Sequence, residues 1–342
     1  MVFASFIAAS VSLACGVGQL QDAPSRLITP QGVEIVADGR LFVLFAALNG
    51  LGYSEETEKK GPPLSAPVFH PLRTQVREAM RKLDDEGKLG DLHKFIDQNP
   101  APVEHYIEVV LARDFGAQKT APELSPAAKK LEGVLPLLEK LGAEAALQKI
   151  YDDALSLEHK QALELFARLD KSFEAAKKHL GLTELKPALE LTVYTNALDA
   201  QGSVRTVKIG TRSSLVVGPG LDSADNAVLV ATLRGKLGPE VSKAYARSDK
   251  LKKAWADLKG FKSITAAYTD GDAYAAETLA DVLAFQAAAV AAGQNPATKE
   301  EDFIDANTKA GLRWTRAVLR ALDGRNEPID AALQKVMAKV SP

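Results

Sequence analysis

The segment VLVATLRGKLGPEV, residues 228–241, has the apolar pattern of a buried helix but few side chains that could do chemistry. Between its apolar residues it holds Gly235, Lys236 and Pro239. Glycine and proline have no side-chain donor or acceptor, and lysine is a cation at neutral pH. From residue 228 to residue 239 the segment therefore offers positive charge, but no imidazole, thiol or carboxylate to transfer a proton or hold a metal.

The pair Gly238-Pro239 also affects the backbone of this segment. Proline lacks the N–H for the helical hydrogen bond, and its ring clashes with the preceding turn at a cost of about 3 kcal/mol. It also disfavours the helical conformation of the residue before it. The sequence therefore predicts that the helix ends near Leu237, with Gly238 at its C-cap and Pro239 opening the next helix.

Composition excludes several classes of protein. The chain has 342 residues, of which 46% are hydrophobic and 25% charged, as expected for a folded globular protein. Its 42 Lys and Arg residues nearly balance its 44 Asp and Glu residues, and no basic stretch is interleaved with aromatic residues. We therefore expect no nucleic-acid partner. The single cysteine, Cys15, excludes an internal disulfide and a thiolate metal cluster.

The N-terminus resembles the export signal of a bacterial lipoprotein. Residues 2–14, VFASFIAASVSLA, form an apolar run that is too short to span a bilayer and ends directly before Cys15. We expect residues 1–14 to be a signal peptide, Cys15 to be lipidated, and residues 15–32 to be a tether. This predicts an exported cell-envelope protein whose only membrane contact is the lipid anchor. The run lacks a preceding Lys or Arg, and Ser12 replaces the usual aliphatic residue, so a buried N-terminal helix with a free cysteine is the alternative.

The rest of the chain is mainly helical in its periodicity. Helical spacing dominates residues 33–187, with separate helices expected at 143–155 and 157–180. Residues 188–220 alternate between apolar and polar, and Asp199 and Gln201-Gly202 are typical turn residues, so two or three antiparallel strands are predicted. Helices return from residue 222 onwards. The expected fold is mainly α with a small central antiparallel β-sheet, an α+β fold, divided into an N-terminal helical part (33–187) and a second part (188–342).

A small sheet, a buried helix and a longer helix bearing a glutamate resemble, in this order, the zincin-like metallopeptidases of the gluzincin type. The layout from about residue 33 to residue 322 is similar to an uncharacterised bacterial family of zincin-like domains. The similarity lies in the segments LFVLFAALNGLGY, FHPLRTQVREAM, VVGPG, VLVATLR and YAAETLADVLAFQ. The resemblance implies a zincin-like fold for residues 188–342.

In such enzymes an HExxH motif places two zinc-binding histidines on one helix face, a glutamate between them acts as general base, and a later glutamate is the third ligand. The resemblance puts these four roles on Gly235, Lys236, Pro239 and Glu277 in this chain. Three of the four cannot serve zinc, and no histidine follows residue 179. The resemblance therefore implies a degenerate member of the family, without a metal or other cofactor.

The remaining carboxylate, Glu277, would then point at the place of the absent metal. A buried unpaired charge costs several kcal/mol, so we expect an ion pair of Glu277 with Lys236 or with Arg234. The alternative is that Glu277 and Lys236 are separate, solvated surface charges.

These observations favour a catalytically inactive, metallopeptidase-like protein of the cell envelope with a binding or scaffolding role towards an unknown protein or peptide. One alternative is an active metal-dependent hydrolase that recruits its metal with upstream histidines and Glu277. Another is a structural envelope lipoprotein whose cleft has no function.

Overall fold

The computed structural model describes residues 25–53, 71–112, 123–187, 191–210, 212–220, 224–258, 260–261, 264, 268, 270–294 and 299–340. The predicted signal peptide and Cys15 lie outside these residues, so the lipid anchor stays a prediction. Of the predicted tether, residues Ser25–Ile28 form strand β1, which pairs with the next strand.

The protein has an α+β fold, mainly helical with one five-stranded sheet in the order β1-β2-β3-β5-β4. The other strands are β2 (Val33–Ala37), β3 (Leu191–Thr195), β4 (Val204–Ile209) and β5 (Arg212–Val217). The prediction of an antiparallel sheet is wrong in part, because β2 pairs with β3, and β3 with β5, in parallel. The pairs β1 with β2 and β4 with β5 are antiparallel. Alternation within residues 188–220 indicates local hairpins, but it does not show that β2, which precedes α1 to α8 in the chain, pairs with β3.

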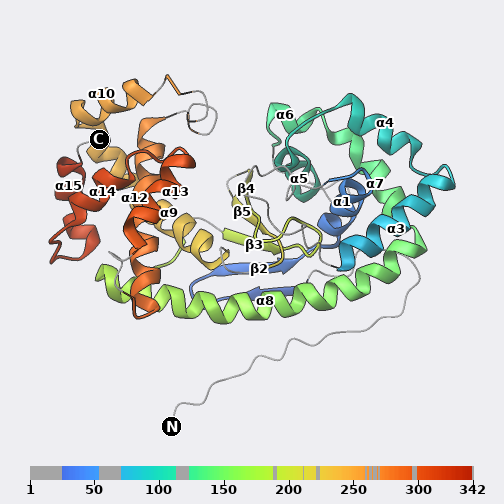
Figure 1. The fold of residues 1–342 in the computed structure, drawn as a ribbon, viewed down its shortest axis with the longest axis horizontal. Coiled ribbons are helices and arrows are strands. Elements are labelled where there is room, and N and C mark those ends of the chain that lie inside the picture. Colours follow the sequence, from blue (N-terminus) through green and yellow to red (C-terminus); the bar gives the residue numbers. More distant parts are fainter. Residues whose placement is uncertain are drawn as a thin grey trace, which may run out of the picture.

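The helices fall into two groups at opposite ends of the sheet (Figure 1). The first group comprises α1 (Gly39–Gly50), α3 (Pro71–Asp85), α4 (Gly90–Gln98), α5 (Val103–Ala112), α6 (Pro126–Lys129) and α7 (Leu135–Gly142), with the 3-10 turn η1 (Glu132–Val134). The second comprises α9 (Ala224–Ala246), α10 (Asp249–Leu258), α12 (Gly271–Ala291), α13 (Glu300–Lys309), α14 (Thr315–Leu322) and α15 (Ile329–Lys339). One long helix, α8 (Ala145–Leu180), runs beneath the sheet and reaches both groups.

Helix α8 is continuous where the sequence predicts two helices. Ser156, at the expected break, donates from Oγ to the carbonyl of Asp152 at 3.1 Å. A serine that bonds back to the preceding turn satisfies its hydroxyl within the helix and does not cap a new one. The continuous helix contributes Leu147 to the core of the first helical group and Phe173 to the core of the second.

The sheet divides these two cores because successive residues of a strand point to opposite faces. In β5, Leu215 packs in the core with α9 and α12, whereas Val216 packs in the core with α1 and α5. In β4, Val207 also faces the core that contains α1 and α5. Among the described residues, no helix has the length and apolar character required to span a membrane.

The predicted helix end at Leu237 is wrong, because α9 continues through Pro239 to Ala246. Gly238 lacks the Cβ that would crowd the proline ring, which removes one of the two contacts that disfavour a helical residue before proline. Beyond the proline, Val241 is fully buried and Ala244 nearly so. Burying this face of the helix outweighs the local cost of proline, as tertiary packing commonly outweighs propensity.

We predict that Pro239→Ala raises the free energy of unfolding by about 1–2 kcal/mol. Proline in a helix interior destabilises the folded protein by about 3 kcal/mol. Because proline also restricts the unfolded chain, up to about 1 kcal/mol of this loss is offset. Pro239 is exposed, so little packing is lost. The measurement is a urea unfolding curve of each variant.

Gly238→Ala supplies the internal control. A Cβ at this position meets no atom within 4 Å, so the change should add about 0.5–1 kcal/mol in the Pro239→Ala background and less beside the proline. A loss of stability on Pro239→Ala would mean that the helix ends where the sequence predicted.

Candidate functional site

The candidate site is a cavity of about 430 Å³ between the sheet and the second helical group. Its walls include Val204 and Thr206 from β4, Asn226 and Arg234 from α9, and Glu277 and Asp281 from α12. On α9 the lining residues are 226, 227, 230, 231 and 234, which follow the spacing of one helix face. Gly235 and Lys236 do not line the cavity. The cavity-facing side of α9 therefore passes through Arg234, one residue before the position at which the sequence resemblance places a zinc ligand.

Arg234 and Glu277 form an ion pair across the cavity wall. Arg234 Nη1 lies 2.6 Å from Glu277 Oε2, with the two side chains 34% and 19% exposed. This is the second of the two pairings expected from the sequence. The charge of Lys236, the other candidate, affects Glu184. The pKa of Glu184 is lowered mainly by its hydrogen bond with Lys186, and Lys236 adds to this effect.

Asp281 is a site residue that the sequence reasoning missed. It follows Glu277 by one helical turn, and this i, i+4 spacing was the available signal. Asn307 Nδ2 donates to Asp281 Oδ2 at 2.5 Å, and the same nitrogen lies 3.2 Å from Thr315 Oγ1. Burial raises the pKa of Asp281, and the charge of Glu277 raises it further, against the opposing effect of Asn307. Two carboxyl groups thus share one wall, with a single arginine paired to one of them.

The outer edge of β4 carries backbone groups that face away from the sheet. The Asn196 N–H donates to the Val217 carbonyl at 2.9 Å, so the backbone groups of Val217 are directed towards β3. Val204 lies opposite Val217 in the antiparallel pair of β4 and β5. Because antiparallel partners alternate between bonded and non-bonded pairs, Val204, Thr206 and Lys208 direct their N–H and C=O groups to the free edge. Within the described chain, β4 pairs with β5 alone.

A second cavity, of about 330 Å³, adjoins the first, since Asn226 lines both. Its apolar wall includes Phe285 and Phe303, whose rings stack with centroids 4.0 Å apart. Its polar wall includes Asp225, which accepts a hydrogen bond from Ser172 at 3.2 Å. Apolar walls with a few placed polar groups are typical of ligand-binding clefts.

The residues present do not fit a zinc ion. Gly235 and Pro239 offer no donor, and Glu277 is already paired with Arg234. The described histidines belong to α4, α5 and α8, and none of them lines the cavity; they are His93, His105, His159 and His179. His70 lies outside the described residues. In the part of the chain that the structure describes, no group of three or more His, Cys, Asp or Glu side chains is placed to hold a metal.

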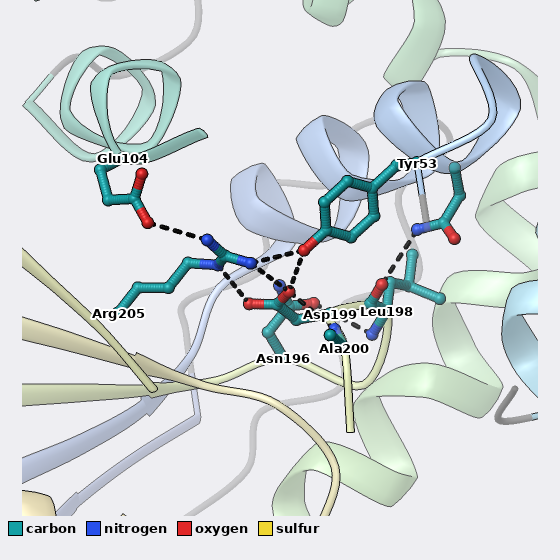
Figure 2. Close-up of polar contacts among 8 residues, drawn as sticks. Tyr53, Glu104, Asn196, Leu198, Asp199, Ala200 and Arg205 are labelled. Carbon is teal, nitrogen blue, oxygen red and sulfur yellow. Dashed lines mark hydrogen bonds and ion pairs between the residues drawn. The ribbon is translucent and has the colours of Figure 1, made fainter. Parts of the chain in front are cut away.

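On the opposite face of β4, a buried polar network holds the loop that follows β3 (Figure 2). Arg205 donates from Nε to Asp199 Oδ2 at 2.8 Å and from Nη2 to Asp199 Oδ1 at 3.1 Å. The Asp199 side chain is fully buried, and that of Arg205 is 6% exposed. Arg205 Nη1 also donates to Glu104 of α5 at 2.8 Å. Paired, two-point contacts of this kind are the arrangement in which a buried charge is tolerated.

The network continues into α1 and α3. Tyr53 Oη donates to Asp199 Oδ1 at 2.7 Å. Asn49, at the end of α1, donates from Nδ2 to the carbonyl of Leu198 at 2.9 Å, and accepts from Arg73 Nε at 2.8 Å. These bonds fix the loop between β3 and β4 to two helices of the first group. From the sequence Asp199 was predicted only as a turn residue, because its partners come from distant segments.

Glu158 is a second buried carboxyl, in the middle of α8. It is 1% exposed, and its Oε1 accepts from the Ala197 N–H at 3.1 Å. Burial raises the pKa of Glu158 to about 8, with a smaller contribution from the charge of Asp38. Its Oε2 has no hydrogen-bond partner in the described structure, as expected for a side chain that is neutral in the folded protein.

Comparison of the chain with protein-family models, curated proteins and solved structures gives no match. The cleft formed by β4, α9 and α12 is therefore the basis on which function is proposed.

We predict that Asp199→Asn lowers the free energy of unfolding by about 3–5 kcal/mol, because it leaves the Arg205 guanidinium buried without its main counter-charge. Glu104→Gln is the matched control on the same guanidinium. The Glu104 side chain is 40% exposed, so its loss should cost about 1 kcal/mol or less. Chemical unfolding of both variants measures the difference, and equal costs would show that the buried pair is not the dominant contact.

We predict that Glu158 makes the protein less stable as the pH rises from about 4.5 to about 8. In this window the folded protein keeps the proton that the unfolded chain has lost, so stability falls by up to about 1.4 kcal/mol per pH unit. Glu158→Gln keeps an acceptor for Ala197 and removes the titration. The free energy of unfolding of the wild type should therefore fall relative to that of the variant across this range, and parallel pH profiles would contradict the burial effect.

Proposed function

We propose that this protein is a catalytically inactive, metallopeptidase-like binding protein whose cleft holds an extended segment of a peptide or of another protein. The observation that carries the proposal is the free edge of β4 beside the cavity. The outward backbone groups of Val204 and Thr206 lie at the wall of a space of about 430 Å³. An extended segment can add a strand to such an edge, with the backbone supplying affinity and alternate side chains supplying specificity.

The zincin-like fold is part of this proposal. It is supported by the order of the elements, in which the edge strand β4 is followed by α9 and then by α12 bearing Glu277. The absence of catalysis is supported by the chemistry of the side chains. Arg234 pairs with the one carboxylate that corresponds to a zinc ligand, and neither Gly235 nor Pro239 can replace a histidine.

The proposed setting is the bacterial cell envelope, with export and a lipid anchor at Cys15. Its support is the apolar run before the cysteine. In that setting the cleft would be presented to proteins or peptides outside the cytoplasm. The proposal includes no nucleic-acid partner, because the chain has a net charge of −2 and no basic stretch interleaved with aromatic residues.

Two alternatives make different predictions about the cleft. A metal-dependent hydrolase that uses Glu277 would bind zinc stoichiometrically after removal of metal by a chelator and reconstitution, and would lose that zinc on Glu277→Ala. A purely structural envelope protein would bind no extended peptide at β4. Metal analysis of both forms and the peptide experiment below therefore separate the three functions.

We predict that Thr206→Pro weakens binding of an extended peptide by at least about tenfold. Proline removes the outward N–H at this position, and edge strands tolerate proline where the N–H faces solvent. The probe is an array of acetylated heptapeptides with alternating Thr and Val, varied at the central residue and applied to the full chain. Protection of the β4 amides from hydrogen exchange on binding would place the peptide at this edge.

Thr206→Val is the matched control, because it keeps the backbone N–H and a side chain of nearly the same volume. It should bind as the wild type does. Equal binding by the proline and valine variants, both shown to be folded by circular dichroism, would contradict strand addition at β4.

A further inference from the structure

The wall of the cleft carries more negative than positive charge. Among its lining residues Arg234 is the one cation, whereas Glu277 and Asp281 are both carboxylic acids. Arg234 is occupied by Glu277, and the wall also holds the neutral side chain of Asn226. The charge left over is therefore that of Asp281. A bound anion would be repelled by both carboxylates. Arg234 would not offset this repulsion, because it is already paired with Glu277.

Asp281 is held in a fixed orientation by one of its two oxygens. Asn307 contacts Oδ2 and is itself held near Thr315 Oγ1. The neutral amide of Asn307 is the hydrogen-bond donor that the described residues provide to Asp281. Asp281 is half-buried, and a carboxylate that has lost part of its water and gained a neutral amide is stabilised by an incoming cation. The cavity thus combines enclosed space with Asp281, a hydrogen-bond acceptor of fixed orientation whose charge is not paired with Arg234.

We propose that the segment bound in this cleft carries a lysine or arginine whose charged end pairs with Asp281, beside Glu277. This inference rests on the proposed function, because the segment reaches the cavity by pairing with the edge of β4. In a strand added to that edge, every second side chain points to the face on which Val204 and Thr206 line the cavity. One basic residue at such a position can bring its charge to α12, since Glu277 and Asp281 of that helix line the same cavity as Val204 and Thr206.

Four peptides test the charge preference. They are amidated heptapeptides Thr-Val-Thr-X-Thr-Val-Thr with fluorescein at the N-terminus, in which X is Lys, Arg, Gln or Glu. Binding to the full chain is measured by fluorescence anisotropy. The Lys or Arg peptide should bind at least about tenfold more tightly than the Gln peptide, the Glu peptide should be weakest, and added salt should reduce the preference.

Variants of α12 locate the preference. Asp281→Asn keeps an acceptor for Asn307 and removes the charge, so the ratio of Lys to Gln affinities should fall to about one. Asp272→Asn is the matched control, because Asp272 lies in the same helix, accepts a hydrogen bond from Ser242 at 2.7 Å, and is not a cavity residue. It should keep the full ratio. If Asp281→Asn does not fold, Glu277→Gln replaces it, and freeing Arg234 should then bring the Glu peptide closer in affinity to the Lys peptide.

The outcomes separate this inference from the function on which it rests. Equal affinities for the Lys and Gln peptides in the wild type, or tighter binding of the Glu peptide, would overturn the charge preference while leaving strand addition intact. A preference that persists unchanged in Asp281→Asn would also overturn it. If none of the four peptides binds, the proposed function fails, and the cationic ligand fails with it.

Discussion

The buried pairing of Arg205 with Asp199 is the contact on which the shape of the cleft depends. Arg205 belongs to β4, and its side chain reaches the loop after β3 on the face towards α1 and α5. Its neighbours Val204 and Thr206 point to the other face and line the cavity. A single strand therefore has a fixed charged network on one side and a binding wall on the other, and the network holds the free edge in position against α9 and α12.

The local features of the fold could be predicted from the sequence. Alternation predicted strands within residues 188–220, and three strands occur there. Helical spacing predicted helices within residues 33–187, and α1 is one of them, running from Gly39 to Gly50 with Asp38 capping its start. The parallel pairing of β2 with β3 could not be predicted, because it joins segments on either side of α1 to α8 and periodicity carries no information about distant partners. The same limit hid the partners of Asp199.

For the candidate site, the sequence predicted an ion pair at Glu277, but it did not predict which face of α9 lines the cavity. A cation beside Glu277 was expected, and Arg234 fills that role, but the cavity face of α9 could be located only from the path of the helix. That path depended on Pro239, whose local cost is outweighed by the burial of Val241 beyond it. The rule that proline ends a helix considers only the local cost of proline and not the burial of residues beyond it. Asp281 differs from this. Its helical spacing from Glu277 could be seen in the sequence, but only the cavity shows that both side chains line the same site.

The continuity of α8 has a consequence for how the molecule loses its structure. The helix contributes Leu147 to one core and Phe173 to the other, so neither core can come apart without exposing part of the same helix. Separate melting of the two ends would require the helix to break near its midpoint, where Glu158 and its bond to Ala197 hold it against the sheet. Heat should therefore dismantle both ends in one cooperative event, and a ligand seated against α9 and α12 would protect the distant α1 and α3 as well.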